Sequence, residues 1–284
     1  MDMVRVAEFP PDIDVTPVRN TLESHHIPHK FIEENGTFVL YVGRDQQVAE
    51  VVELLRKSVR EQQAQGPGGM TLPGIGLLFQ RTPVTIVCLA LSIVGAMIPE
   101  WGFGFLHWLT FQDFVFVNET KIAFSTINDS LNQGEYWRLI TPVFIHFGIF
   151  HIVFNGLWLW EFGRRIEVVA GSLHFLMLVM VIGLVSNVSQ YLWSGPSLFG
   201  GMSGVIFGLL GYIWIRGKLA PHRGLLLPNG IVALMIGWLV VCMTGVIDLF
   251  FQGSIANAAH LSGLLSGMAL GAIFGMVGRG RTAP

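Results

Sequence analysis

Long runs of apolar residues, separated by short polar connections, make up most of this chain. A helix of about 20 residues crosses the hydrocarbon core of a bilayer, and six segments can do so with their flanking residues. These segments cover residues 83–100, 140–163, 172–193, 198–215, 228–249 and 256–277. The fourth is short and rich in glycine, which indicates a central helix shielded from lipid. The pattern predicts an α-helical polytopic membrane protein, with a six-helix bundle over residues 83–284.

The first 62 residues follow a different pattern, which is typical of a small soluble α/β domain. Strand and helix signals alternate in the order β-α-β-β-α, over residues 4–9, 16–26, 30–33, 37–42 and 45–59. Asn35-Gly36 is a strong hairpin signal, and Asp45 can cap the last helix, whose apolar residues have amphipathic spacing. This order resembles part of a ferredoxin-like fold. Residues 63–82 are rich in glycine and proline and are expected to be a flexible linker.

The composition agrees with a membrane protein and excludes several other classes. Hydrophobic residues make up 52% of the chain, charged residues 13%, and the mean hydropathy is +0.58. The net charge of -2 gives no reason to expect nucleic-acid binding. Cys88 and Cys242 both lie in apolar segments, where they are expected to pack and not to form a disulfide or a zinc site. Residues 1–17 lack the apolar run of a cleavable signal peptide.

The positive charges predict the orientation in the membrane. If the N-terminus is cytoplasmic and six helices cross, all 17 lysines and arginines except Lys121 and Arg138 lie on the cytoplasmic side. This asymmetry is typical of inner loops, so both termini are expected in the cytoplasm.

The first outer loop, residues 101–139, is long and aromatic. Two interpretations are equally consistent with it: an aromatic belt at the interface, or a loop partly sunk into the outer leaflet. Its aromatic residues include Trp101, Phe103, Phe105, Trp108, Phe111, Phe114 and Phe116. Trp137-Arg138 is expected to hold this loop in place.

Polar residues on three predicted helices should meet at one depth. Ser203 and His260 lie near the outer starts of the fourth and sixth helices, and the outer half of the second is expected to carry His146, His151 and Asn155. His151 and Asn155, four residues apart, share one helical face. Polar side chains inside a membrane are costly and mark functional sites. A nucleophile and a base at one level favour a serine hydrolase, although each residue alone fits a packing or structural role.

Two stripes of small residues indicate how Ser203 and His260 can approach each other. One runs through Gly200, Gly204 and Gly208, and the other through Ala259, Gly263, Gly267, Gly271 and Gly275. Such stripes let two helix backbones come close in a membrane. If the stripes face each other, the serine and the histidine come within hydrogen-bond reach, as activation of a nucleophile requires. Taken alone, the stripes are better explained by simple helix packing.

Four motifs of this chain are similar to those of rhomboid intramembrane serine proteases. They are Trp137-Arg138, His146-x4-His151-x3-Asn155, Gly201-Met202-Ser203-Gly204 and Ala259-His260-x2-Gly263. The resemblance covers nearly the whole chain and includes the bacterial GlpG type, which also carries a small cytosolic N-terminal domain. It implies a six-helix rhomboid bundle with a Ser-His dyad and no catalytic carboxylate.

The resemblance also implies roles for the matching residues. Ser203 would be the nucleophile, and His260 the general base and then the acid. His151 and Asn155, together with the backbone N–H of Ser203, would stabilise the oxyanion. The residues expected to support the site are His146, Phe207, Gly201 and Gly204. Phe207 would stack against the imidazole.

Polar residues of the second and third predicted helices are also expected to have structural or water-binding roles. Ser186 and Gln190, four residues apart on the third helix, either hold water for hydrolysis or satisfy each other. Glu167 is expected to anchor the inner end of the second helix together with Arg164 and Arg165.

The resulting hypothesis is an intramembrane serine endopeptidase in the bacterial inner membrane. Its partners would be the lipid bilayer and transmembrane protein substrates, cleaved near the outer (periplasmic) face, with no metal, cofactor or nucleic acid. The oligomeric state stays unknown. A transporter or channel and a non-catalytic rhomboid-like binding protein are the alternatives. A metalloprotease is disfavoured because the chain has no His-Glu-x-x-His motif.

Overall fold

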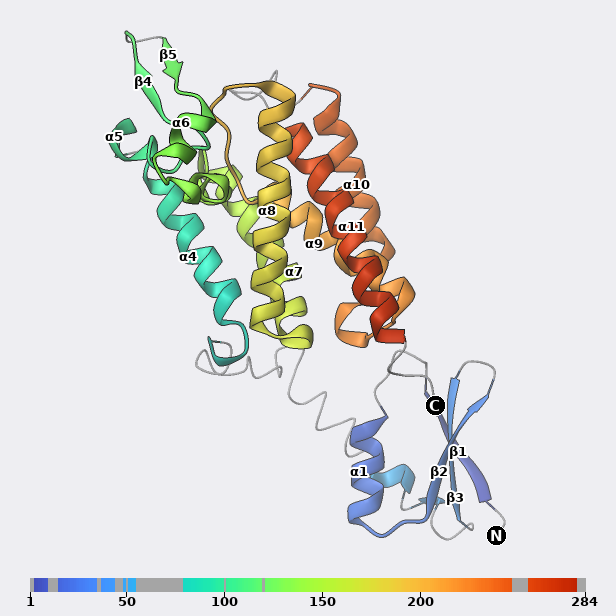
Figure 1. Ribbon diagram of the computed structural model, residues 1–284. Helices are drawn as coiled ribbons and strands as arrows, with labels where there is room; N and C mark the ends of the chain where they lie inside the picture. The colour runs from blue at the N-terminus through green and yellow to red at the C-terminus, as the bar shows by residue number, and fades with distance from the viewer. Residues whose placement is uncertain are drawn as a thin grey trace. The chain divides into compact units, whose positions relative to one another are not determined.

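A computed structural model of the chain describes residues 3–9, 15–34, 37–43, 48–49, 51–54, 79–99, 101–118, 121–246 and 255–279 (Figure 1). The chain divides into two compact units, Met1–Gly74 and Ile75–Pro284. Asn35-Gly36, Asp45 and most of the predicted linker lie outside the described residues.

The first unit is a three-stranded antiparallel sheet with a helix. Its elements are β1 (Met3–Phe9), α1 (Thr16–Ser24), β2 (His29–Glu34) and β3 (Thr37–Gly43), and the strand order is β1-β3-β2. Phe31 pairs with Leu40, and Val4 with Val42. Alternate residues of β3 face the core, where Leu40 and Val42 are buried with Leu22 of α1. The first four elements of the predicted β-α-β-β-α order are confirmed, and the described residues of the last predicted helix, 48–49 and 51–54, are helical. The assignment to the ferredoxin-like fold stays a prediction.

The second unit is mostly helical, and its long helices pack side by side (Figure 1). They are α4 (Pro83–Met97), α7 (Ile149–Ala170), α8 (Ser172–Ser194), α9 (Ser203–Leu219), α10 (Asn229–Met243) and α11 (Asn257–Arg279). Between α4 and α7 come α5 (Phe103–Leu106), β4 (Phe114–Phe116), β5 (Ile122–Phe124), α6 (Ile127–Asn132) and the 3-10 turns η1 (Tyr136–Leu139) and η2 (Thr141–Phe144). A third 3-10 turn, η3 (Arg223–Leu225), precedes α10.

Each of the six predicted apolar segments overlaps one of the long helices. Within the described residues, α8 and the stretch Asn257–Val277 of α11 are long and apolar enough to cross a membrane, and α4 and α10 are shorter apolar helices. The number of membrane crossings therefore stays a prediction. α9 is buried on all sides from Gly204 to Ile213, as expected for a central helix.

The second predicted segment begins too early. Residues 140–148 form the turn η2 and irregular backbone, and α7 starts only at Ile149 and continues to Ala170. Gly148 stops a helix from starting earlier, because its φ of 88° lies in the left-handed region. The placement of His146 on this helix is therefore wrong, since it lies in the segment before it.

The fourth predicted segment also begins too early. Residues 198–202 are not helical, and α9 starts at Ser203. Gly201 has a φ of 119°, which a continuous helix cannot contain. Gly200 consequently precedes the helix and packs against Ile145, so it is not part of the stripe on α9.

The two small-residue stripes do face each other. A Cβ atom on Gly263 or Gly267 of α11 would overlap the carbonyl oxygen of Gly204 or Gly208 on α9. A Cβ atom on Gly208 would in turn lie 2.9 Å from the carbonyl oxygen of Gly263. The two backbones are thus in direct contact, which only glycine allows at these positions.

Glu167 has other partners than predicted. Its carboxylate accepts hydrogen bonds from the backbone N–H groups of Val84 and Thr85 (both 2.8 Å), from Thr85 Oγ1 (2.7 Å) and from Ser172 Oγ (2.7 Å). An anion fits there because the first N–H groups of α4 have no partner within their own helix. It anchors the end of α7, as expected, but through α4 and not through arginines.

The two arginines that were assigned to Glu167 bind a different carboxylate. Arg164 and Arg165 both pair with Glu161, at three and four residues' distance along the same helix. The helical repeat brings these side chains together, whereas Glu167 points toward the start of α4.

Arg138 holds the loop between α4 and α7, as predicted. Its side chain is fully buried, its Nε donates to Glu135 Oε2 (2.7 Å), and its Nη1 donates to the carbonyl oxygens of His107 and Thr110. Trp137 Nε1 donates to the carbonyl oxygen of Trp108 (2.9 Å). The loop is therefore tied down from its C-terminal end.

Candidate active site

Ser203 and His260 meet at the start of two helices. Ser203 is the first residue of α9, and His260 lies in the first turn of α11. Ser203 Oγ is 2.7 Å from His260 Nε2, and His260 is only 6% exposed. The backbone contact between α9 and α11 brings the two residues together, so the predicted proximity is confirmed.

The turn before Ser203 has a conformation that requires glycine. Gly201 has a φ of 119°, and its N–H donates to the carbonyl oxygen of Pro142 (3.0 Å). A Cβ atom on Gly201 would lie 2.6 Å from His151 Nε2 and 3.5 Å from Asn155 Nδ2. Gly201 therefore allows both side chains of α7 to approach the turn that carries Ser203.

His151 and Asn155 present nitrogen atoms to this turn. The N–H of Phe147 donates to His151 Nδ1 (3.4 Å), so the proton of a neutral imidazole is on Nε2, the atom that faces Gly201. Asn155 is buried, and its Nδ2 has no hydrogen-bond partner among the described residues. Buried amides are nearly always paired. Because no atom among the described residues accepts from Asn155 Nδ2, this nitrogen can donate to a ligand.

His146 contributes through the backbone, not from a helix. Its Nδ1 lies 2.9 Å from the carbonyl oxygen of Phe144, and the N–H of Met202 donates to its Nε2 (3.4 Å). Its ring is fully buried and meets the ring of His151 edge-on at 4.9 Å. It thus links the segment before α7 to the residue before Ser203.

Phe207 and Gly204 shape the surroundings of His260. The ring centroids of Phe207 and His260 are 5.1 Å apart with a tilt of 45°, so the rings are in contact but not stacked in parallel. A Cβ atom on Gly204 would lie 2.9 Å from Ser186 Oγ. Nδ1 of His260 has no hydrogen-bond partner in the described part of the chain.

Gln190 ties the start of α11 to α8, a role that the sequence did not indicate. Its Oε1 accepts from the N–H of Ala259 (3.1 Å), and its Nε2 donates to Ser194 Oγ (2.7 Å). Ser186 Oγ is buried with no partner among the described residues. The interpretation that Ser186 and Gln190 satisfy each other is therefore wrong, and their role in holding water stays a prediction.

Asn257 was also missed as part of this region. Its Nδ2 donates to the carbonyl oxygen of Cys242 (3.1 Å), which joins the first residue of α11 to the end of α10. The only signal in the sequence is that asparagine is common where helices begin.

Among the described residues, no group of three or more histidines, cysteines or acids is arranged to hold a metal.

Comparison with known proteins gives matches in both units. The family model described as "Rhomboid domain" matches residues 133–277, and the "Rhomboid N-terminal domain" matches residues 1–63.

Several curated proteins named "Rhomboid protease GlpG" are similar to this chain. Those of Yersinia pestis (strain Pestoides F) and Serratia proteamaculans (strain 568) are 41% and 43% identical over 140 residues, which is 48% and 49% of this chain and 49% of each relative. That of Yersinia enterocolitica is 34% identical over 185 residues, 65% of this chain and 59% of the relative. The chain therefore spans about half the length of the first of these relatives. Because the rhomboid domain model matches half of the chain and includes Ser203 and His260, the chain belongs to the rhomboid family.

Proposed function

We propose that this protein is an intramembrane serine endopeptidase that cleaves transmembrane segments of other membrane proteins through a Ser203–His260 dyad. The observation that carries the proposal is the 2.7 Å separation of Ser203 Oγ and His260 Nε2 in a buried site. The curated relatives named as rhomboid proteases support the same activity.

The first half of the reaction forms an ester on the enzyme. Ser203 Oγ attacks the carbonyl carbon of the scissile peptide while its proton passes to His260 Nε2. The tetrahedral intermediate then collapses, the C–N bond breaks, and His260 gives this proton to the leaving amine. In the second half, water attacks the ester and loses a proton to His260, and the new carboxyl end leaves as Ser203 regains its proton.

The oxyanion of the intermediate would bind donors that are already in place. As the first residue of α9, Ser203 has a backbone N–H with no partner within that helix. Nε2 of His151 and the unpaired Nδ2 of Asn155 converge on the preceding turn from α7. Donors that are fixed before the reaction stabilise developing charge without reorganisation.

The substrate follows from where the dyad lies. Both catalytic residues stand at the N-terminal ends of α9 and α11, which the positive-inside pattern places toward the outer face. A transmembrane segment would therefore be cut near its outer end, where it leaves the apolar layer. Helical peptide bonds are shielded, so a segment that unwinds easily is the preferred substrate class.

The polar cluster also argues against the alternative of a transporter. The polar side chains of Ser203, His260, His151 and Asn155 gather at one end of their helices. The residues that follow Ser203 along α9 are buried and apolar up to Gly211, so the cluster does not continue through the unit as an ion path would.

The test uses purified protein in liposomes with a reporter transmembrane segment. Wild type should cut the reporter near its outer end, as mass spectrometry of the products would show, and Ser203→Ala and His260→Ala should not cut it while melting as wild type does. A fluorophosphonate probe, which needs no substrate, should label wild type and leave Ser203→Ala unlabelled. Cleavage that survives in either variant, or labelling elsewhere, would refute the dyad.

A further inference from the structure

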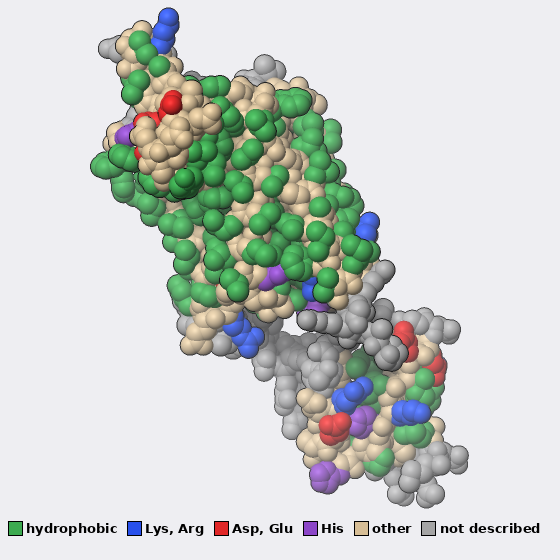
Figure 2. Space-filling model, viewed as in Figure 1, with side chains coloured by type: hydrophobic (Ala, Val, Ile, Leu, Met, Phe, Trp, Pro, Cys, Tyr) green, Lys and Arg blue, Asp and Glu red, His purple; other side chains and the backbone are tan. Residues whose placement is uncertain are grey.

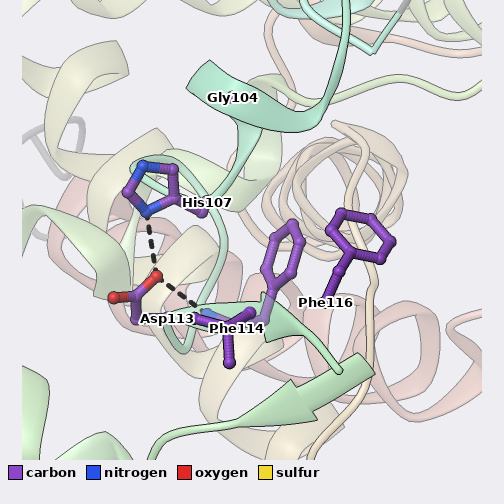
Figure 3. A pocket seen from close by; sticks show the side chains of 6 residues that line it. Gly104, His107, Asp113, Phe114 and Phe116 are labelled. Carbon is purple, nitrogen blue, oxygen red and sulfur yellow. Dashed lines mark hydrogen bonds and ion pairs between the residues drawn. The ribbon is translucent and has the colours of Figure 1, made fainter. Parts of the chain in front are cut away.

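A pocket lies on the loop between α4 and α7, and none of its lining residues belongs to the Ser203 site. It has a volume of about 340 Å³ and is lined by Gly104, His107, Asp113, Phe114, Val115 and Phe116. Figure 3 shows His107 and Asp113 on one side of the pocket, with the rings of Phe114 and Phe116 beside them.

The carboxylate of Asp113 is held in place by one of its oxygens. Oδ1 lies 2.9 Å from His107 Nδ1 and accepts from the N–H of Phe114 (2.8 Å). Oδ2 has no hydrogen bond among the described residues, and the side chain is 40% exposed. Arg138 Nη2 forms a long ion pair with Oδ1 (3.9 Å), and Nε of the same buried guanidinium pairs with Glu135 at 2.7 Å. The pocket therefore presents one oriented carboxylate oxygen to a ligand.

Aromatic rings lie in and beside the same pocket. Phe114 and Phe116 meet edge-on with centroids 5.8 Å apart, and the ring of Trp108 lies 5.0 Å from that of His107. A carboxylate beside aromatic rings recognises an ammonium group, through an ion pair and through cation–π attraction. A primary ammonium fits better than a quaternary one, because it can donate a hydrogen bond to Oδ2 of Asp113.

The surface around the pocket indicates the kind of molecule that carries this ammonium. Exposed apolar side chains run along α4 and into the loop: Val87, Leu91, Val94, Met97, Trp101 and Phe105. Figure 2 shows hydrophobic side chains covering much of this side of the unit. In a membrane protein such a face contacts acyl chains, and aromatic residues at its end mark the headgroup level. A ligand can thus lay its chains on α4 while its headgroup reaches the pocket.

We propose that this pocket binds the headgroup of a phospholipid with a primary ammonium, of the ethanolamine type, in the leaflet on the side of Ser203. The proposal needs only the membrane location of the family and is independent of protease activity. The lipid would bind at the outer face of the loop that Arg138 holds in place.

The test is retention of lipids by the full chain released from nanodiscs that hold equal amounts of ethanolamine and glycerol phospholipids. Native mass spectrometry should show that wild type retains about two- to fivefold more phosphatidylethanolamine than phosphatidylglycerol. This is the scale expected for a partly exposed ion pair. Asp113→Asn keeps an oxygen to accept from His107 and Phe114 but loses the charge, so the ratio should fall to about one.

A matched control removes the same charge elsewhere in the loop. Asp129 caps α6 and does not line the pocket, so Asp129→Asn should keep the wild-type ratio. Equal retention in wild type, or a ratio unchanged by Asp113→Asn in a protein that melts normally, would overturn the proposal. The proposal would also be overturned if Asp113→Asn retained lipids as wild type does but cleaved a reporter with a lysine at its outer end more weakly. The pocket would then bind protein and not lipid.

Discussion

Two buried polar clusters lie at opposite ends of α7, and they differ in how their hydrogen bonds are used. At the C-terminal end, both oxygens of Glu167 are occupied by four donors from α4 and Ser172. At the N-terminal end, Asn155 Nδ2 and His260 Nδ1 are buried without a partner in the described part of the chain. Leaving a buried donor unpaired is costly, so unused hydrogen-bonding capacity separates a site for chemistry from a structural anchor.

The largest effect should come from removing the proposed nucleophile, Ser203. Ser203→Ala is expected to lower the rate of reporter cleavage by at least about 10⁴-fold, because the oxyanion donors alone give only residual catalysis. The melting temperature should stay near that of wild type, since one hydroxyl at a helix start is lost. Single-turnover cleavage in liposomes measures the rate. A variant that cleaves at nearly the wild-type rate would refute Ser203 as the nucleophile.

Removing the unpaired donor should affect catalysis and not folding. Asn155→Ala is expected to lower kcat by about 10²–10³-fold, the usual loss for one oxyanion donor, with a smaller change in KM. Stability should change little, because Nδ2 has no partner to lose. Steady-state kinetics and a melting curve distinguish this from a structural role, which would lower stability first.

The opposite result is expected at the other end of the helix. Glu167→Gln places an amide where both oxygens accept hydrogen bonds, and should lower the free energy of unfolding by about 2–4 kcal/mol. Cleavage by the folded fraction should be unchanged. Glu161→Gln is the control, because Glu161 is partly exposed and pairs with arginines, and should cost about 0–1 kcal/mol. If both variants unfold equally easily, Glu167 is not the anchor.

The contact between α9 and α11 can be tested at its glycine positions. Gly267→Ala would press a methyl group into the backbone of α9, which cannot move aside as a flexible side chain could. It should destabilise the protein by about 3 kcal/mol or more and lengthen the Ser203–His260 separation. Gly237→Ala on α10 meets nothing within 4 Å and should be neutral or stabilise by up to about 1 kcal/mol. Melting curves of the two variants in the same detergent make the comparison.

The sequence predicted regular elements better than the segments that connect them. The predicted limits of the third and sixth segments, 172–193 and 256–277, agree closely with α8 and α11, because long apolar runs determine both. Residues 140–148 and 198–202 are mostly apolar too, but they form the turn η2 and irregular backbone that is buried or half-buried except at Phe147 and Gly148. Hydropathy cannot distinguish such segments from membrane-spanning helices. The prediction from hydropathy therefore placed His146 on the second helix, although it lies before α7.

The candidate site was predictable in its residue types but not in all of its contacts. The repeats of small residues on α9 and α11 predicted the approach of Ser203 to His260. Contacts between distant segments left no such periodic signal. The pairing of Glu167 with Thr85 joins residues 82 positions apart, and the bond from Ala259 to Gln190 joins residues 69 apart. Only the packing of the helices reveals them.

The backbone contact between α9 and α11 has a consequence for how the protein responds to its bilayer. A membrane that is thinner than the hydrophobic length of these helices makes them tilt. Because the carbonyl oxygens of Gly204 and Gly208 touch α11 directly, the two helices can tilt only as one body. Lipid chain length should therefore change the depth of Ser203 and His260 in the bilayer, while the distance between their side chains stays the same.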